Sequence, residues 1–450
     1  MPQERGRILA AAKRVRTFKE ARLGLSKGEA LEDAKIFLER ERSVKGEGCP
    51  LGTDFFAVMR AVAKNDLAAA YEKLLEADPF PAVTGRIAPD PYPETQVFNR
   101  KSQKISLRAI ACFVADQVRV KKASAQPRSR QKVAVVGSGP AGLAAASGLA
   151  RLGFRVTVFE SSHVLGGTLS YCYPLFRLPE KALSTSLSRL QAQGIEFVSN
   201  ILIGRDAGIQ ELFDQGFAAV LLACGAGVPK GLGIPGEDAA GVLSVESFLK
   251  LRHWMKAGIE PYSTPLDVGR KVLIVGGGER AFDAARILVR LGRTVTVVVS
   301  GSDSALGVEA AMAREAAEEG VKVRTFARAL RVQKDHVGCV KVLECEHLDY
   351  KIDGQGQLTT VVQPDSDFTM EADTILTVAG GRPDTLFLHR VPGLEFASDG
   401  APVLKSGTRH ETSLGGVFAC GQLTEPDAGF LAAVNSGKRA VGEITKFLEV

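Results

Sequence analysis

The chain has 450 residues, of which 45% are hydrophobic and 24% charged, and its formal net charge is +6. This length exceeds what one hydrophobic core usually holds, so we expect two or three globular domains. Basic residues are spread along the chain and no run approaches the ~18 apolar residues of a membrane span, so we expect a cytoplasmic protein with no nucleic-acid or membrane role.

Residues 1–118 are predicted to form a helical domain. The stretches KGEALEDAKIFLERE (27–41) and DFFAVMRAVAKNDLAAAYEKLLE (54–76) carry apolar residues at the three- and four-residue spacing of amphipathic helices. The basic segment that follows has no such periodicity, and we expect residues 119–131 to be a solvated linker. Docking of an acidic partner on this segment is the alternative.

A first glycine-rich turn follows a predicted strand in KVAVVGSGPAGLAAASGLARLGFRVTVFE (132–160). A G-x-G-x-x-G pattern opens an Ala-rich helix, and a second strand ends in Glu160 at the spacing of a dinucleotide fingerprint. Such glycines allow a tight turn and let backbone N–H groups reach a pyrophosphate, while the acid accepts hydrogen bonds from a ribose. The predicted dinucleotide site consists of Gly137, Gly139, Pro140, Ala141, Gly142 and Glu160.

A second glycine-rich turn occurs in KVLIVGGGERAFDAARILVRLGRTVTVVVSGSDS (271–304). Its candidate nucleotide contacts are Gly276, Gly278, Glu279, Arg280 and Ala281. The strand after the helix ends near Val299 without the acid typical of an NAD site or the arginine typical of an NADP site. Two interpretations stay open, a nucleotide site or a retained fold with a weakened site.

Two dinucleotide folds in one chain suggest a flavin and nicotinamide oxidoreductase. The stretches LGGTLSYCYPLFRLPEKAL, AVLLACGAGVPKGLGIPGED and GGVFACGQLTEPDAGFLAAVNSGKRA resemble the small, flavin-carrying subunit of NADPH-dependent glutamate synthase and the similar module of dihydropyrimidine dehydrogenase. The resemblance covers nearly the whole chain, including GCPLG and EADPFPAVTGRI in the helical domain.

This resemblance implies an α/β fold behind an N-terminal all-α domain. Two Rossmann-like dinucleotide-binding domains are expected, with the nicotinamide domain inserted in the FAD domain. The expected FAD-binding domain comprises residues 132–265 and 382–450, and the expected NAD(P)-binding domain comprises residues 266–381.

In this family the helical domain binds two iron–sulfur clusters, largely through cysteines. When the family's cysteine motifs are aligned with this sequence without gaps, the cluster-ligand positions fall on Phe37, Arg40, Lys45, Cys49, Ala88, Tyr92 and Gln96. Only one of these is a thiol, and the other side chains cannot replace thiolates at iron. We therefore expect no metal site, with aromatic residues filling the vacated space. The seven cysteines are scattered without a C-x-x-C pair, so a disulfide framework is also not expected.

The resemblance implies further flavin contacts. Gly166, Gly167, Leu169 and Arg177 are expected near the flavin, and Gly421 and Gln422 would begin a C-terminal contact, with Gln422 in place of the family's Asp. Cys172 stands where the family has a glycine, which raises the hypothesis of a thiol oxidoreductase. Such enzymes use two closely spaced cysteines, and Cys172 has no neighbouring partner, so this hypothesis is the weakest.

The nicotinamide site departs further from the family. Its Tyr-Arg-Arg, which binds the 2′-phosphate of NADPH, falls on Val299, Ser300 and Gly301, and Glu279 replaces an Asn. Two arginine side chains that would bind the 2′-phosphate are absent and a carboxylate is added, so NADH should be favoured over NADPH.

The sequence therefore predicts an FAD-dependent NAD(P)H oxidoreductase subunit, similar to the glutamate synthase small subunit, that passes electrons to a redox partner protein or another acceptor. No catalytic side chain is predicted, because the flavin itself carries out hydride chemistry. The alternative is a non-catalytic flavin-binding scaffold subunit of a redox complex, with a decayed nicotinamide site.

Overall fold

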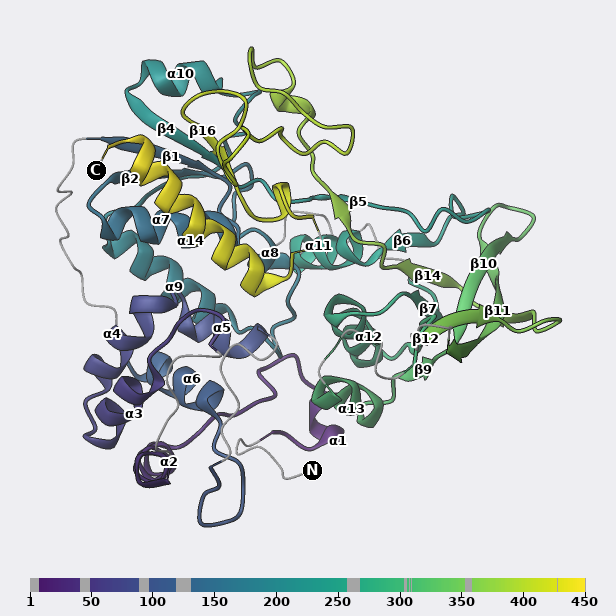
Figure 1. The fold of residues 1–450 in the computed structure, drawn as a ribbon. Helices are drawn as coiled ribbons and strands as arrows, with labels where there is room; N and C mark the ends of the chain where they lie inside the picture. Colours follow the sequence, from purple (N-terminus) through teal and green to yellow (C-terminus); the bar gives the residue numbers. More distant parts are fainter. Residues whose placement is uncertain are drawn as a thin grey trace.

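The computed structural model describes residues 8–40, 49–88, 97–118, 131–256, 268–302, 306, 308, 310–352, 358–426 and 428–449. In these ranges the chain forms an N-terminal helical region and two five-stranded parallel sheets (Figure 1). This arrangement agrees with the predicted α/β class and is consistent with two Rossmann-like folds. None of the helices in the described part of the chain has the length and apolar character needed to cross a membrane.

The helical region contains six helices among the described residues: α1 (Ala11–Arg14), α2 (Lys27–Arg40), α3 (Phe55–Ala63), α4 (Leu67–Ala77), α5 (Pro81–Ile87) and α6 (Leu107–Gln117). The stretch 54–76 contains two of these helices. Asn65 adopts a positive φ of 59°, and the Asp66 carboxylate then caps α4 by accepting a hydrogen bond from the Ala69 N–H. Asp54 and Ser106 cap α3 and α6 in the same way.

The first sheet is entirely parallel, with strand order β16-β4-β1-β2-β3. Its strands are β1 (Lys132–Val136), β2 (Arg155–Phe159), β3 (Glu196–Val198), β4 (Phe217–Leu222) and β16 (Val417–Ala419). We call this sheet the first lobe, together with α7 (Pro140–Arg151), α9 (Glu180–Ala192), α10 (Ile209–Asp214) and α14 (Phe430–Phe447). Alternate strand residues face two cores, and the core on the α7 and α14 side continues into the helical region.

The second sheet is also parallel, with strand order β6-β14-β7-β8-β9. Its strands are β6 (Val242–Ser244), β7 (Lys271–Val275), β8 (Thr294–Val298), β9 (Lys322–Arg324) and β14 (Thr374–Thr377). One face packs on α11 (Val245–Lys256), α12 (Glu279–Arg290) and α13 (Ala310–Glu318). The other face packs on an antiparallel sheet of β10 (Ala327–Lys334), β11 (Val340–Ile352), β12 (Leu358–Val362) and β13 (Phe368–Glu371). These elements form the second lobe.

The strands of the second sheet lie in sequence between β4 and β16 of the first sheet. The two connecting segments pair with each other as β5 (Val228–Pro229) and β15 (Gly381–Arg382). The predicted domain division at residues 265 and 266 stays a prediction. β6 and α11 lie before it in sequence, and both pack with the second sheet.

An N-terminal segment, residues 8–22, ties the helical region to the second lobe. The buried Arg14 guanidinium donates to Glu319 at 2.8 Å, and the same carboxylate accepts from Arg286 and Arg290 of α12 at 2.7 and 2.5 Å. The ring of Phe176, in the segment before α9 of the first lobe, lies beside the guanidinium groups of Arg286 and Arg290, which are 4.9 and 4.0 Å from its centroid. The two lobes and the helical region are thus connected by buried charged contacts.

Candidate functional site

The first glycine-rich turn connects β1 to α7 in a tightly packed conformation. Gly137 has a φ of +109°, and a Cβ there would lie 2.5 Å from the carbonyl oxygen of Ala223 on the neighbouring strand end. A Cβ on Gly142 would lie 2.0 Å from the carbonyl oxygen of Gly137. Both positions therefore require glycine for the turn, strand and helix to pack as they do.

Gly139 lies at the N-terminus of α7 and faces open space. Its backbone is extended, with a φ of −70° and a ψ of 178°, and a Cβ there would have no atom within 4 Å. No side chain caps the helix, which begins with Pro140. Backbone N–H groups next to open space at a helix N-terminus fit an anionic ligand such as a pyrophosphate. The residues present at this turn therefore fit the pyrophosphate of a dinucleotide such as FAD.

A second pair of glycines, Gly166 and Gly167, packs against this turn. Both have positive φ, and a Cβ on Gly167 would lie 2.9 Å from the Cα of Gly139. Ser138 is fully buried between the two turns, and its hydroxyl donates to Glu160 at 2.6 Å and accepts from the Gly166 N–H at 2.9 Å. Sequence reasoning missed Ser138, although a hydroxyl inside the G-x-G pattern was a possible signal.

Glu160 follows β2 and is buried. One carboxylate oxygen accepts from the Ser138 N–H at 3.0 Å and from its hydroxyl, and the other accepts from the Ser162 N–H at 2.8 Å and from the Ser161 hydroxyl at 3.2 Å. A carboxylate offers about four acceptor positions, so these four bonds orient Glu160, and a ribose hydroxyl would bind there in place of the Ser161 hydroxyl. The ribose contact stays a prediction.

The C-terminal contact is built by η3 (Gly421–Leu423) and α14. Gly421 has a φ of +71°, and a Cβ there would lie 2.7 Å from that of Ala141 in α7. α14 lies beside α7 in Figure 1, and a Cβ on its Gly437 would lie 2.1 Å from the Ala141 carbonyl oxygen. The Gln422 amide nitrogen donates to the Ala428 carbonyl at 2.9 Å, so one of its two N–H groups is used within the protein.

Cys172 follows α8 (Thr168–Tyr171), which contains the buried Leu169. The thiol is buried, and burial raises its pKa to about 12 although the nearby Arg280 opposes the rise. All seven cysteines are free. A thiol with this pKa is protonated at neutral pH and is a poor nucleophile, which weakens the thiol oxidoreductase hypothesis further.

The second glycine-rich turn connects β7 to the N-terminus of α12, where Gly278 has a φ of +92° and Gly139 of the first turn has a φ of −70°. A Cβ on Gly276 would lie 2.6 Å from the Val378 carbonyl oxygen, whereas a Cβ on Gly278 would have no atom within 4 Å. No side chain caps α12, and Ala281 is buried against the sheet. Gly278 and Gly139 thus face open space at equivalent points, and this turn also fits a dinucleotide.

Charged side chains surround the second turn and are paired with one another. Arg280 donates to Glu246 of α11 at 2.8 Å. Glu279 pairs with Arg177 at 2.8 Å, so the negative charge expected there is compensated by a cation from the first lobe. The sequence could not anticipate this pair. The predicted contact of Arg177 with the flavin stays a prediction, and its observed polar contacts are with the second lobe and the helical region, while its guanidinium lies 5.4 Å from the Tyr173 ring centroid.

In the family that this sequence resembles, the 2′-phosphate of NADPH binds at the end of the strand that corresponds to β8. Val299 is buried, Ser300 is exposed, and the Ser302 N–H donates to the Tyr350 hydroxyl at 3.0 Å. Arg324, which sequence reasoning missed, ends the neighbouring β9, beside Val298. Its guanidinium donates to His347 at 3.1 Å and lies 5.1 Å from the Phe368 ring centroid, facing the antiparallel sheet.

The family's cluster positions in the helical region are occupied by packed side chains where the structure describes them. Phe37 is fully buried, 5.3 Å from the ring of Phe56, and Ala88 and Cys49 are buried too. Arg40 donates to the Phe98 carbonyl. The other three positions, Lys45, Tyr92 and Gln96, lie outside the described residues. Among the described residues no group of three His, Cys, Asp or Glu side chains could hold a metal ion. These residues do not fit an iron–sulfur cluster.

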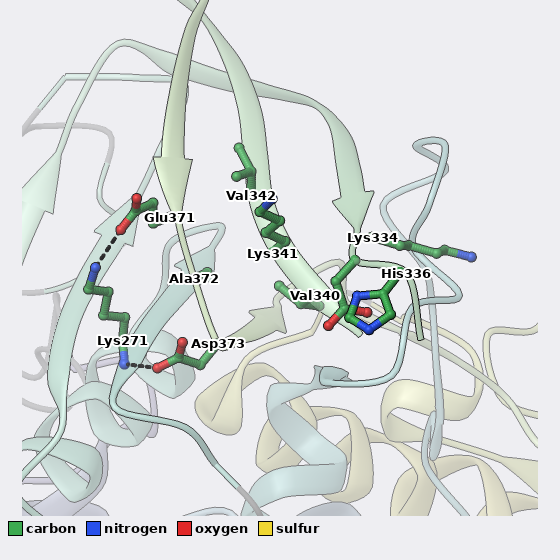
Figure 2. Close-up of a pocket in the computed structure, with 10 residues that line it drawn as sticks. Lys271, Lys334, His336, Val340, Lys341, Val342, Glu371, Ala372 and Asp373 are labelled. Atoms are coloured by element: carbon green, nitrogen blue, oxygen red, sulfur yellow. Dashed lines mark hydrogen bonds and ion pairs between the residues drawn. The ribbon is translucent and has the colours of Figure 1, made fainter. Parts of the chain in front are cut away.

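An open cavity of about 630 Å³ lies at the far edge of the second sheet (Figure 2). Lys271, the first residue of β7, pairs there with Glu371, and Lys334 pairs with Asp238. The glycine-rich turn follows the other end of β7. Because ligands of such sheets bind outside the carboxyl ends of the strands, this cavity is not the dinucleotide site.

Comparisons with known proteins point to one family. A family model described as pyridine nucleotide-disulphide oxidoreductase matches residues 131–440, and one described as dihydropyrimidine dehydrogenase domain II, 4Fe-4S cluster, matches residues 14–123. The chain is 30% identical over 427 residues to the glutamate synthase [NADPH] small chain of Mycobacterium tuberculosis, covering 89% of this chain and 85% of the relative.

A second relative is the beta subunit of the NADPH-Fe(3+) oxidoreductase of Geobacter sulfurreducens, which is 27% identical over 446 residues. The alignment covers 92% of this chain but spans only 65% of that subunit. Among solved structures, M. tuberculosis FprA in complex with NADPH aligns with a TM-score of 0.60 at 17% identity, covering 71% of this chain and 85% of FprA. This likeness supports the fold alone.

Proposed function

The chain belongs to the pyridine nucleotide-disulphide oxidoreductase family, with the glutamate synthase small chain among its relatives, and we propose that it is an FAD-dependent NAD(P)H oxidoreductase subunit. The observation that carries this proposal is the pair of equivalent open glycines, Gly139 and Gly278, at the N-termini of α7 and α12. One chain with two such turns can bind two dinucleotides, as hydride transfer between a nicotinamide and a flavin requires.

The first turn supplies the residues for FAD. The N–H groups that open α7 would bind the pyrophosphate, and Glu160, oriented by Ser138, would accept hydrogen bonds from the adenosine ribose. When bound, FAD would supply the site that accepts hydride. The protein contributes orientation and electrostatics, so no acid or base side chain is needed for this step.

The second turn would bind the nicotinamide nucleotide, and we propose that NADH is preferred over NADPH. Ser300 and Gly301 offer no cation to a 2′-phosphate, and the guanidinium of Arg324 is already engaged with His347. In the family that the sequence resembles, arginine guanidinium groups at these two positions hold such a phosphate, and this chain has none there. Both relatives compared above carry NADPH in their names, so cofactor preference is the feature in which this chain would differ from them.

We propose that electrons leave through a partner protein or a small acceptor that approaches the flavin directly. The described cluster positions of the helical region do not fit iron, so no route through bound clusters is derived. The relatives are named as the small chain and the beta subunit of larger enzymes, which supports a partner subunit for this chain as well.

A flavin spectrum followed by anaerobic titration tests the proposal. The purified protein should show the absorbance bands of bound FAD, and NADH should bleach them to completion without added catalyst. Protein that lacks flavin after purification and reconstitution would contradict the proposal. Bound flavin that neither NADH nor NADPH reduces would instead favour the non-catalytic scaffold.

A further inference from the structure

Arg177 lies where three parts of the chain meet. Its guanidinium donates to the Asp283 carboxylate of α12 at 2.7 Å, pairs with Glu279 at 2.8 Å and donates to the carbonyl oxygen of Ile87, the last residue of α5, at 2.8 Å. The side chain is only 12% exposed. A single cation from the segment between α8 and α9 of the first lobe thus holds both the second lobe and the helical region.

The two carboxylates that pair with Arg177 differ in their exposure to solvent. Glu279 is the first residue of α12, directly after the open Gly278, and is 21% exposed. Asp283 lies one turn further on and is 1% exposed, and one of its oxygens is buried without a hydrogen-bond partner. Burial raises the pKa of Asp283 and the Arg177 charge opposes that rise, so Arg177 favours the ionised form.

Glu279 presents an electrostatic problem for the proposed nucleotide site. A carboxylate at the N-terminus of α12 is favourable for the helix alone, but a dinucleotide brings a doubly negative pyrophosphate to the same place. An uncompensated Glu279 would repel that group. The Arg177 guanidinium, 2.8 Å from this carboxylate and 2.7 Å from that of Asp283, compensates part of the charge of Glu279.

We propose that Arg177 is a positioning residue of the nicotinamide nucleotide site. It lowers the negative charge that Glu279 presents so that a pyrophosphate can bind at α12, and it fixes this helix against the first lobe. The inference rests on the proposed function, because it assumes that the second turn binds a nucleotide.

Binding of ADP-ribose tests the inference, since this probe carries the pyrophosphate but no redox chemistry. Its dissociation constant is measured by calorimetry on the flavin-loaded protein and on Glu279→Gln, Arg177→Gln and the double variant. Glu279→Gln should bind about threefold to tenfold more tightly, because Arg177 then faces the pyrophosphate with less compensation. Arg177→Gln should bind at least about tenfold more weakly.

The double variant separates electrostatics from structural damage. With both charges removed, ADP-ribose affinity should return to within about threefold of the unmodified protein. If Arg177 only holds the lobes together, the double variant binds ADP-ribose as weakly as Arg177→Gln does, and the inference is wrong. Arg177→Lys should keep part of the affinity, because a lysine can neutralise Glu279 but lacks the fork that spans three partners.

Arg86→Gln is the matched control, since Arg86 is a buried arginine that pairs with Glu20 of the N-terminal segment and with Asp116 of α6, and contacts neither carboxylate of α12 in these pairs. It should lower the melting temperature and leave the ADP-ribose affinity unchanged. If Arg177→Gln does not fold, Glu279→Gln decides alone, and an unchanged affinity in that variant refutes the inference. An unmodified flavin-loaded protein that does not bind ADP-ribose would refute the proposed nucleotide site itself.

Discussion

The substitution Gly139→Val should remove FAD and leave the fold intact. A Cβ at Gly139 would meet no atom within 4 Å, and the extended backbone there is open to a β-branched residue. The cost to folding is then that of a poorer helix N-cap, about 1 kcal/mol. The new side chain would occupy the space through which the α7 N–H groups reach a pyrophosphate.

The effect on binding follows from the bonds that are lost. Hydrogen bonds to charged groups contribute about 1.5–3 kcal/mol each, so loss of two backbone contacts to the pyrophosphate corresponds to about 3–6 kcal/mol. The dissociation constant of FAD should therefore rise by about two to four orders of magnitude, which yields colourless protein after purification.

The assay compares Gly139→Val with Gly442→Val, prepared side by side. Gly442 is exposed on α14, and a Cβ there also meets no atom within 4 Å, so it controls for the same substitution in open space. Flavin content, FAD affinity after reconstitution and the circular dichroism of each variant are measured. Full flavin in a folded Gly139→Val protein would refute the placement of the site. Equal flavin loss in both variants would show that the effect is not specific.

Three further predictions concern the nucleotide, iron and pH. Flavin reduction at varied nucleotide concentration should show NADPH binding at least about tenfold more weakly than NADH, and Ser300→Arg with Gly301→Arg should recover part of that difference. NADPH preference in the unmodified protein would contradict this, and Arg324→Gln would then show whether Arg324 supplies the cation. Protein prepared without oxygen should contain no stoichiometric iron or acid-labile sulfide, and one cluster equivalent would overturn the expectation. Burial would raise the pKa of Glu319, but Arg286 and Arg290 hold it at about 2, below the 4.5 of a free side chain. The ionised Glu319 should contribute on the order of 2 kcal/mol to the free energy of unfolding, after allowance for solvent screening. This contribution should be complete above pH 4.5 and fall toward pH 2. The difference in unfolding free energy between the unmodified protein and Glu319→Gln should therefore shrink in acid. A difference in unfolding free energy between the two proteins that does not depend on pH would refute this prediction.

The sequence predicted the elements whose signals are local. Both glycine turns, with their strands and helices, are encoded within about 30 consecutive residues, and both occur in the structure as expected. The family inferred from the motifs is confirmed by the matches to residues 131–440 and 14–123.

The features that the sequence did not reveal depend on contacts between distant residues. Arg177 meets Asp283 across 106 positions, and Ser138 meets Gly166 across 28. Arg324 reaches the end of β8 only because β9 pairs beside it. Local pattern carries no information on such pairs, since their geometry is set by how the sheets and helices pack.

The core shared by the helical region and the first lobe makes these two parts one thermodynamic unit. Apolar side chains from α2 to α6 continue without a break into α7, α14 and one face of the first sheet, whereas the second lobe has separate clusters. Loss of packing in either part removes the apolar surface on which the other depends. The helices at the N-terminus therefore support the packing beneath the proposed flavin site, and the part of the chain that the structure describes should unfold as two cooperative units although it contains three regions.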